Sequence, residues 1–239
     1  METLVLLHGF AGTGAAWGAV EAAMQPETYR PLAPDLPGHG AAGDARPCDV
    51  GACADAVLAA APARFALAGY SMGGRVALHL ALRAPERVTR LVLVATTAGL
   101  DDPAERAARR EADGALADWI EAHDLDAFAD RWLGQPLFAG DGPAATALAR
   151  QDIARNRPSG LAASLRQAGT GAMTPVWDRL GELRMPVTVV VGERDAKFRA
   201  IGDRLAAALP GAGGVTVVPG AGHALPRSAP AALAAALAA

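Results

Sequence analysis

The residues best suited to nucleophilic chemistry lie in the run Gly69-Tyr70-Ser71-Met72-Gly73, a G-x-S-x-G pattern. The run follows a buried apolar stretch and opens a helical pattern, which is the strand–turn–helix setting of a nucleophile elbow. The two glycines let a strand and a helix approach closely while the serine occupies a strained turn. A helix amino terminus beside Ser71 also favours negative charge there. The pattern therefore predicts Ser71 as the catalytic serine.

Two further side chains complete a catalytic triad in the chain order serine, acid, histidine. Among the five histidines, only His223 follows the point where strand patterns resume. The acid should leave the carboxyl end of the preceding strand, where Glu193 and Asp195 are candidates and Asp195 is preferred. His223 is then expected to take the serine proton while Asp195 orients the imidazole. The alternatives are a helix N-cap for Asp195 and an ordinary loop position for His223.

Backbone amides are predicted to stabilise the negative charge that develops during the reaction. Phe10 follows the first apolar run and Met72 follows the serine, so their N–H groups are the candidate oxyanion-hole donors. No catalytic role is predicted for three of the other histidines. His39 and Asp35 are expected to be structural in a tight loop, and His79 and His123 to be helix residues.

Short apolar runs alternate with helical patterns, which predicts a mostly parallel α/β sheet flanked by helices. Strands are expected at residues 4–7, 29–33, 64–67, 89–94, 187–191 and 215–218. Helices are expected at residues 14–24, 50–61, 72–83, 199–209 and 228–238. Pro31 makes the second strand the weakest of the six.

One region breaks the alternation. Residues 99–183 contain no convincing strand, are rich in charge, and fit several amphipathic helices. Helices inserted here are expected to form a cap over the carboxyl ends of the strands, where ligands bind. The sequence thus predicts a core of residues 1–98 and 184–239 with a helical cap at 99–183. The alternative is a peripheral helical decoration.

Composition excludes several classes of function. The chain has 239 residues, 51% of them hydrophobic, and a formal net charge of −3. A buried core is feasible, and no basic field suited to nucleic acid or anionic lipid is present. Cys48 and Cys53 suffice for neither a disulfide framework nor a zinc site. No signal peptide or membrane span is apparent, so a cytoplasmic protein is expected.

The order of the motifs LHGF, DLPGHG and GYSMGG resembles that of α/β-hydrolase-fold proteins over nearly the whole chain. A narrower resemblance rests on GYSMGGR at 69–75, ERAAR at 105–109, Trp132 with the following QPLF, GTG at 169–171, and GERDAKF at 192–198. These motifs are similar to those of the 2-succinyl-6-hydroxy-2,4-cyclohexadiene-1-carboxylate synthase family of menaquinone biosynthesis. One departure is LPRSAP at 225–230, where that family usually has an acidic residue before a proline.

The resemblance implies a lyase on a hydrolase fold, with no metal or organic cofactor. Such enzymes eliminate pyruvate from 2-succinyl-5-enolpyruvyl-6-hydroxy-3-cyclohexene-1-carboxylate, and the serine–histidine pair abstracts a proton. The resemblance also implies that Arg109 holds a substrate carboxylate, that Tyr70 and Trp132 line the site, and that Lys197 contributes to it. For Tyr70 and Trp132 the alternative is core packing.

Arg75 makes independent physical sense as a carboxylate ligand. It lies four residues after Ser71 on the same helix face, and its side chain should tilt back toward the helix amino terminus. A small polycarboxylate substrate calls for fixed guanidinium groups, which bind carboxylates in a bidentate manner. The alternative is a surface charge. Arg106 and Arg110 are interpreted as solvated, and a contribution from Arg155 or Arg157 is left open.

Two other functions remain possible on this reasoning. A carboxylesterase or carbon–carbon bond hydrolase would use the same triad, because the fold does not dictate the reaction. A non-catalytic ligand-binding protein is the third possibility, although all three triad members are present. Dehalogenases and epoxide hydrolases are disfavoured because they use aspartate where this chain has Ser71. The sequence is silent on oligomeric state.

Overall fold

The structure is a computed structural model that describes residues 1–25, 27–211 and 214–238. Six strands form one sheet in the order β2-β1-β3-β4-β5-β6, and every neighbouring pair is parallel. The predicted parallel α/β sheet is thereby confirmed. The strands are β1 Glu2–Leu7, β2 Tyr29–Leu32, β3 Phe65–Tyr70, β4 Val88–Val94, β5 Val187–Gly192 and β6 Val215–Val218. The Pro31-containing strand β2 lies at the sheet edge, where a missing N–H is tolerated.

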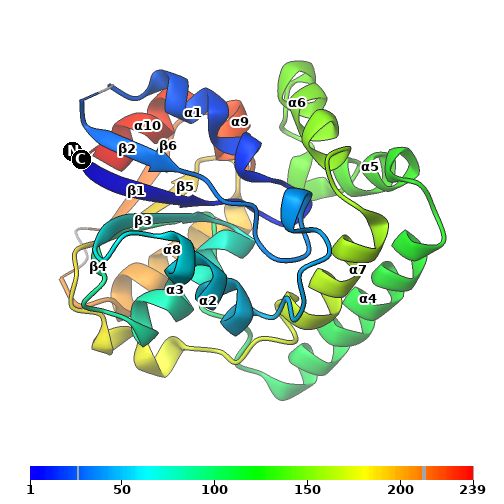
Figure 1. Ribbon diagram of the computed structural model, residues 1–239, viewed down its shortest axis with the longest axis horizontal. Coiled ribbons are helices and arrows are strands. Elements are labelled where there is room, and N and C mark those ends of the chain that lie inside the picture. The colour runs from blue at the N-terminus through cyan, green and yellow to red at the C-terminus, as the bar shows by residue number, and fades with distance from the viewer. Residues whose placement is uncertain (26, 212–213, 239) are drawn as a thin grey trace.

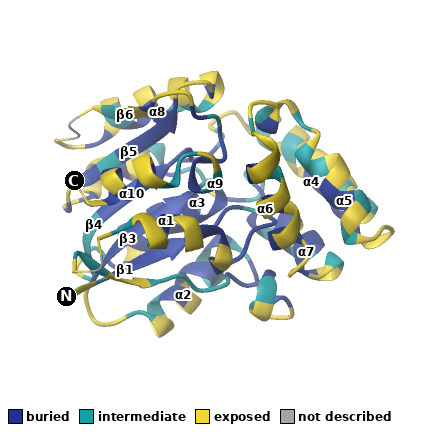
Figure 2. Cartoon of the chain, turned by 90° about the horizontal axis from the view of Figure 1, so that it is seen from above, coloured by how far each residue is buried: buried dark blue, intermediate teal, exposed yellow. Residues whose placement is uncertain are grey.

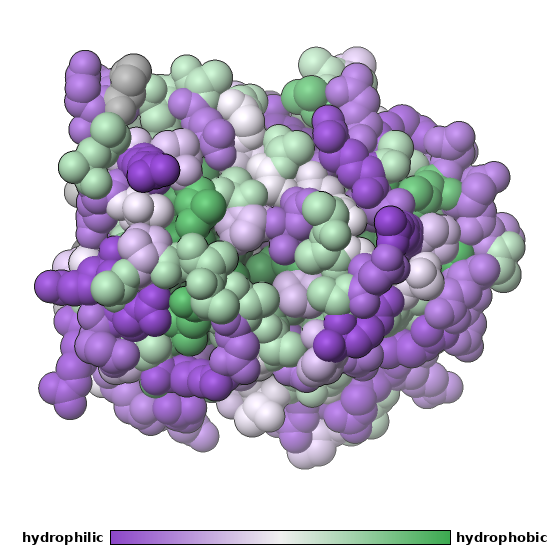
Figure 3. All heavy atoms as spheres, in the orientation of Figure 1, coloured by the Kyte–Doolittle hydropathy of each residue, from purple (hydrophilic) through white to green (hydrophobic). Residues whose placement is uncertain are grey.

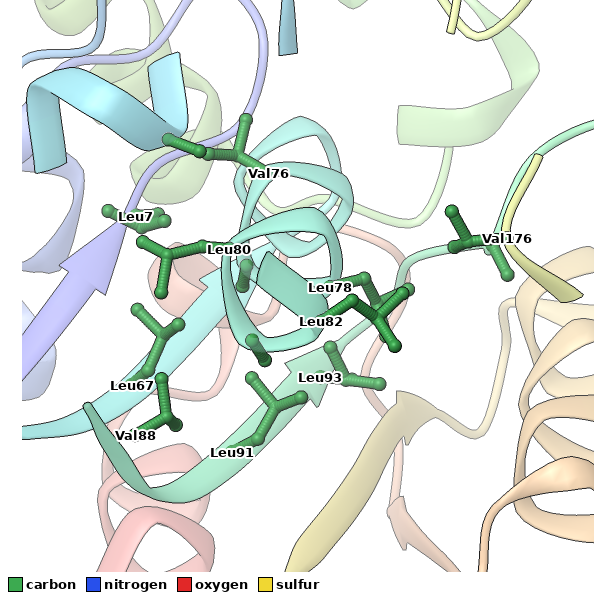
Figure 4. Packing of buried hydrophobic residues seen from close by; sticks show 14 of the residues in the cluster. Leu7, Leu67, Val76, Leu78, Leu80, Leu82, Val88, Leu91, Leu93 and Val176 are labelled. Carbon is green, nitrogen blue, oxygen red and sulfur yellow. The ribbon is translucent and has the colours of Figure 1, made fainter. Parts of the chain in front are cut away.

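Helices cover both faces of the sheet (Figure 1). One face carries α1 (Gly18–Ala23) and α10 (Pro230–Ala238), and the other carries α2 (Val50–Ala60), α3 (Met72–Arg83) and α8 (Ala196–Ala208). Successive side chains of a strand point to opposite faces. Accordingly, Val5 and Leu7 join one buried cluster, whereas Leu4 and Leu6 join the other. Figure 4 shows Leu80 of α3 between Leu7 and Leu67 of the strands.

Most predicted elements lie within a few residues of the observed ones, and α3 spans the predicted residues 72–83. The predicted helix 228–238 corresponds to α10, which begins at Pro230, and a short helix that was not predicted, α9 (Leu225–Ser228), precedes it. The helix interpretation of His79 is confirmed. That of His123 is wrong, because it lies beyond the end of α4 (Pro103–Glu121) and its ring stacks on Trp119.

The segment between β4 and β5 is helical, with no strand anywhere in residues 99–183, all of which the structure describes. It contains α4, α5 (Leu125–Leu133), α6 (Pro143–Ile153) and α7 (Pro158–Ala168). Figures 1 and 2 both show these four helices beyond the end of the sheet to which the strands point. We refer to α4–α7 as the cap, and we propose residues 99–183 as the inserted unit.

The cap has a buried cluster of its own, which includes Ile120, Phe128, Ile153, Leu161 and Leu165. Its outer surface in Figure 3 is mostly hydrophilic, with scattered apolar residues. The rest of the insertion packs against the sheet rather than within the cap. Leu180 and Leu183 belong to the buried cluster between the sheet and helices α2, α3 and α8. In the described part of the chain, no helix is both long and apolar enough to cross a bilayer.

Candidate active site

The strand order creates a crevice at the carboxyl end of the sheet. β1 and β3 are neighbours, yet the helices that follow them, α1 and α3, pack on opposite faces. The connections that leave these two neighbouring strands therefore run to opposite faces of the sheet and leave a crevice between them. Ligands of open α/β sheets bind in such a crevice, which is called a topological switch point. Phe10 follows β1 and Ser71 follows β3, so the topology places both residues at this crevice.

Ser71 occupies the turn between β3 and α3 with φ +52° and ψ −109°, a conformation rarely adopted by residues other than glycine. Close backbone packing holds this turn. A Cβ atom on Gly73 would lie 2.2 Å from the carbonyl oxygen of Leu7, and one on Gly69 would lie 2.3 Å from that of Gly73. The Thr96 hydroxyl also donates to the Ser71 carbonyl over 2.7 Å. The glycines of the motif are thus sterically required.

The three side chains predicted as a triad are brought together. His223 Nε2 lies 3.2 Å from Ser71 Oγ, and His223 Nδ1 lies 2.7 Å from Asp195 Oδ2. Asp195 and His223 are both buried. An ionised carboxylate only accepts hydrogen bonds, so Nδ1 carries the proton and Nε2 is free to accept from the serine hydroxyl. The geometry can therefore transfer a proton from Ser71 to His223.

The helix-cap interpretation of Asp195 holds as well. Its Oδ1 atom accepts the backbone N–H of Phe198 over 3.2 Å, at the beginning of α8. One carboxylate thus caps a helix with one oxygen and orients the imidazole with the other. The hydrogen bond from the Phe198 N–H fixes the Asp195 carboxylate, and it therefore also fixes the orientation of the His223 ring.

The two candidate oxyanion donors flank the serine. Met72 is the first residue of α3, so its N–H has no acceptor within the helix. Within the described residues, the amide of Phe10 donates to no backbone or side-chain acceptor. His8 steadies the loop before Phe10, because its Nε2 accepts from the Leu36 amide over 3.0 Å and its Nδ1 contacts the Gly9 carbonyl over 2.9 Å. Both residues line the same cavity as Ser71, and in the described structure their amides have no hydrogen-bond acceptor.

A cavity of about 670 Å³ separates the sheet from the cap, and Ser71 and His223 lie at its floor. The five residues predicted to bind substrate all line it: Tyr70, Arg75, Arg109, Trp132 and Lys197. The Tyr70 ring lies 5.4 Å from the His223 ring, and the Trp132 ring packs 5.0 Å from that of Phe10. These aromatic residues form the apolar part of the wall.

Arg75 is buried, so the surface-charge alternative is wrong. Its guanidinium donates to the Ala168 carbonyl at the end of α7, and it faces the Arg109–Asp113 pair, in which Nε and Oδ1 are 2.8 Å apart. Burial and the nearby Arg109 charge lower the pKa of Arg75 to about 10. The group therefore stays cationic at neutral pH, and two guanidiniums share the cap side of the cavity.

Several other arginines are placed elsewhere. Arg106 and Arg110 donate to backbone carbonyls and do not line the cavity, nor do Arg155 and Arg157. Arg157 pairs with Asp44 on the surface.

Five charged or aromatic lining residues were not predicted as site residues: Asp113, Phe138, Arg194, Phe198 and Arg227. The available signal was proximity in the chain, because Arg194 adjoins Asp195 and Arg227 follows His223 by four residues. The Phe198 and Phe138 rings lie 4.5 and 6.2 Å from the His223 ring, so they shield the imidazole.

Two buried histidines beside the site make stability depend on pH. Burial lowers the pKa of His8, and burial together with the His8 charge lowers the pKa of His39 well below its usual value. The unfolded chain takes up these protons near pH 6.5, whereas the folded chain does not. The free energy of unfolding therefore decreases as pH falls below about 6.5, and for His39 this loss reaches at most about 2 kcal/mol at pH 5.

The thermal midpoint of wild type and His39→Gln between pH 8 and pH 5 checks this expectation. The difference between the two proteins isolates His39 from the other titrating groups. The variant should lose less stability than wild type toward pH 5. A difference independent of pH contradicts the assignment of a neutral buried His39.

The comparisons with known proteins agree with this geometry. Residues 4–236 match the model of the alpha/beta hydrolase family. A Klebsiella pneumoniae protein named 2-succinyl-6-hydroxy-2,4-cyclohexadiene-1-carboxylate synthase is 35% identical, with 98% of this chain and 92% of the relative covered. The solved structure of MenH from S. aureus aligns with a TM-score of 0.90 at 27% identity, covering 98% of this chain and 91% of that one.

A second solved structure shows that a protein described as an esterase has a similar fold. A thermophilic esterase from Thermogutta terrifontis, solved with malate bound, aligns with a TM-score of 0.82 at 26% identity, over 99% of this chain and 88% of that one. The sheet, the inserted helices and the match over residues 4–236 lead to one assignment. The chain belongs to the alpha/beta hydrolase family, and its resemblance to the 2-succinyl-6-hydroxy-2,4-cyclohexadiene-1-carboxylate synthases extends over nearly its whole length.

Proposed function

We propose that this protein is a carbon–oxygen lyase that eliminates pyruvate from 2-succinyl-5-enolpyruvyl-6-hydroxy-3-cyclohexene-1-carboxylate. The charge of the cavity is the observation that carries this proposal. The chain has a net charge of −3, yet the described lining residues include five cations and only two carboxylates. The cations are Arg75, Arg109, Arg194, Lys197 and Arg227. A concentration of guanidiniums in a partly buried cavity suits a substrate with several carboxylates.

The proposed mechanism begins with proton abstraction. Ser71, hydrogen-bonded to His223, removes a proton from the substrate ring system, and the Asp195 carboxylate stabilises the imidazolium that results. The electron pair of the broken C–H bond forms a new ring double bond, the existing ring double bond shifts by one position, and the C–O bond to the enolpyruvyl group breaks. The group leaves as an enolate, which takes the proton from the His223 imidazolium at carbon and becomes pyruvate. The amides of Phe10 and Met72 stabilise the anion that develops.

Residues of both the cap and the core orient the substrate. In this proposal Arg75 and Arg109 hold carboxylates, and Tyr70 and Trp132 supply the wall against the ring. Lys197 lies on the core side, near the beginning of α8, and adds a further cation. Cations from both the cap and the core would hold the substrate over Ser71 in a reactive position.

An assay of pyruvate release tests the proposal. Purified protein is incubated with the authentic substrate in the presence of a metal chelator, and pyruvate is measured with a coupled dehydrogenase. One pyruvate is expected per substrate consumed, with no effect of the chelator because no metal or organic cofactor is proposed. Absence of pyruvate release from the active, folded protein rejects the lyase assignment.

A carboxylesterase or carbon–carbon bond hydrolase is the alternative. It is favoured by one observation, the structural likeness to an esterase with a TM-score of 0.82. Rapid cleavage of p-nitrophenyl esters without pyruvate release would select this alternative. The cytoplasmic location expected from the sequence stays a prediction.

A further inference from the structure

We propose that Asp152, on the cap helix α6, is a positioning residue that fastens the cap to the loop of the oxyanion donor Phe10 and to the segment after His223. This inference rests on the proposed site but not on the identity of its substrate. Asp152 lies outside the resemblance motifs and does not line the main cavity. Its role follows from the groups that its carboxylate binds.

The Asp152 carboxylate is buried and fully engaged. Its Oδ2 atom accepts the backbone N–H of Thr13 over 3.1 Å and the Nη2 group of Arg227 over 3.0 Å. Its Oδ1 atom accepts the Thr13 hydroxyl. The side chains of Asp152 and Arg227 are 5% and 11% exposed, so this ion pair is shielded from water. Shielded pairs with additional hydrogen bonds hold their geometry far better than surface pairs do.

The two partners of Asp152 each stand close to one part of the proposed machinery. Thr13 is three residues after Phe10, and its hydroxyl also caps the short helix Gly14–Trp17. Arg227 is four residues after His223, on the short helix α9. One carboxylate from the cap therefore joins the loop that carries an oxyanion donor to the segment that carries the histidine.

Asn156 reinforces the same attachment four residues along the chain. Its Nδ2 group donates to the Ala11 carbonyl over 3.1 Å, and its Oδ1 atom accepts the Gly40 amide over 3.0 Å. Ala11 has φ +61°, a left-handed conformation that an alanine adopts only when its surroundings enforce it. Asp152 in the last turn of α6 thus holds Thr13, and Asn156 in the turn after α6 holds Ala11.

Displacing the cap would break these bonds together. Thr13 would lose the acceptor for its amide and hydroxyl, and the Arg227 guanidinium would be left without its partner beside the cavity that it also lines. A buried charge without a partner is strongly unfavourable, so the attached cap and the aligned catalytic groups stabilise each other. Asp152 accordingly acts on catalysis through Thr13 and Arg227 rather than by contact with substrate.

The rate at which a small neutral alkyl fluorophosphonate labels Ser71 tests this inference. Labelling needs the serine, the histidine and the oxyanion donors, but neither pyruvate elimination nor an anionic substrate. In Asp152→Asn the side chain loses its charge and one of its two acceptor oxygens, so the ion pair with Arg227 is lost, and the second-order labelling rate constant should fall about 10- to 100-fold, as for other small misplacements of reacting groups. Asp130→Asn, which breaks the exposed Arg150–Asp130 pair between α5 and α6, is the matched control and should stay within about twofold of wild type.

Wild-type labelling of a folded Asp152→Asn protein overturns the inference, with folding checked by circular dichroism and thermal midpoint. Thr13→Val supplies the test if Asp152→Asn does not fold. It removes the hydroxyl that donates to Asp152 and caps the helix Gly14–Trp17, and it should slow labelling about three- to tenfold. A folded Thr13→Val that labels like wild type overturns the inference.

The double variant Asp152→Asn/Thr13→Val distinguishes positioning from general destabilisation. Both residues act through one attachment, so the double variant should label about as fast as Asp152→Asn alone, and fully additive losses contradict this. Failure of the proposed function has a different signature. A wild-type protein that labels rapidly but releases no pyruvate rejects the lyase while leaving the role of Asp152 measurable.

Discussion

Replacing Ser71 with alanine is expected to lower kcat for pyruvate release about 10²- to 10⁴-fold, which is the usual contribution of a positioned acid–base group. His223 Nε2 lies 3.2 Å from Ser71 Oγ, so without the hydroxyl the imidazole has no proton relay at hydrogen-bond distance. The backbone strain at Ser71 persists in the variant, and the fold should be retained because alanine is smaller than serine. Steady-state kinetics on wild type and variant measure the effect.

Ser164→Ala is the matched control for that experiment. The Ser164 hydroxyl lines the same cavity and contacts the Met72 sulfur over 3.6 Å, and in the described structure it has no bond to His223. Its removal should leave kcat within about twofold. A Ser71→Ala enzyme with more than a tenth of the wild-type kcat contradicts the proposed role of Ser71. For the hydrolase alternative, the same substitution should lower ester cleavage far more, by about 10⁶-fold.

Replacing Arg75 with methionine is expected to lower kcat/KM for the anionic substrate about 30- to 1000-fold, which corresponds to about 2–4 kcal/mol. Methionine replaces the aliphatic part of the side chain but lacks the guanidinium and its charge. The lost interaction is strong because Arg75 is buried, where water competes poorly for a carboxylate. Labelling of Ser71 by the neutral fluorophosphonate should change less than about threefold, because that probe has no carboxylate to hold.

Arg83→Met controls for the loss of an arginine from the same helix. Arg83 lies at the end of α3 and pairs with Asp55 on the surface, with both side chains more than half exposed. It should leave kcat/KM unchanged. The Arg75 guanidinium also donates to Ala168, so thermal midpoints must accompany the kinetics to separate stability from binding. Equal kcat/KM for Arg75→Met and wild type defeats the carboxylate-binding role.

Local patterns predicted the sheet, the serine turn and the members of the triad. Apolar runs bounded by glycine and proline marked the strands, and the G-x-S-x-G run marked Ser71 because only glycine permits the close approaches at positions 69 and 73. Asp195 was preferred over Glu193, and the structure joins it to His223 over 2.7 Å. These features depend on a few neighbouring residues and on the order of strands, and both are legible in a linear sequence.

The sequence predicted less well which cationic side chains line the cavity. Arg75 and Arg109, which the sequence predicts to bind substrate, line the cavity, and so do Arg194 and Arg227, which it does not single out. Arg155 and Arg157, on which the sequence decides nothing, do not line it. The direction of an arginine depends on which face of its helix docks against the sheet. One residue of register turns a helical side chain by about 100°, so spacing alone does not separate a cavity arginine from a surface one.

The attachment of the cap illustrates the remaining limit. Asp152 meets Thr13 and Arg227 across 139 and 75 residues of sequence. Asp152 and Thr13 belong to no motif, and Arg227 lies in the run LPRSAP, which departs from the family pattern. A carboxylate in the chain gains such partners only when separate elements pack around it and exclude water, since burial is what makes the pairing obligatory. The reactive groups could be read from the order of residues, whereas their alignment, charge environment and enclosure arise from long-range packing of the cap against the sheet.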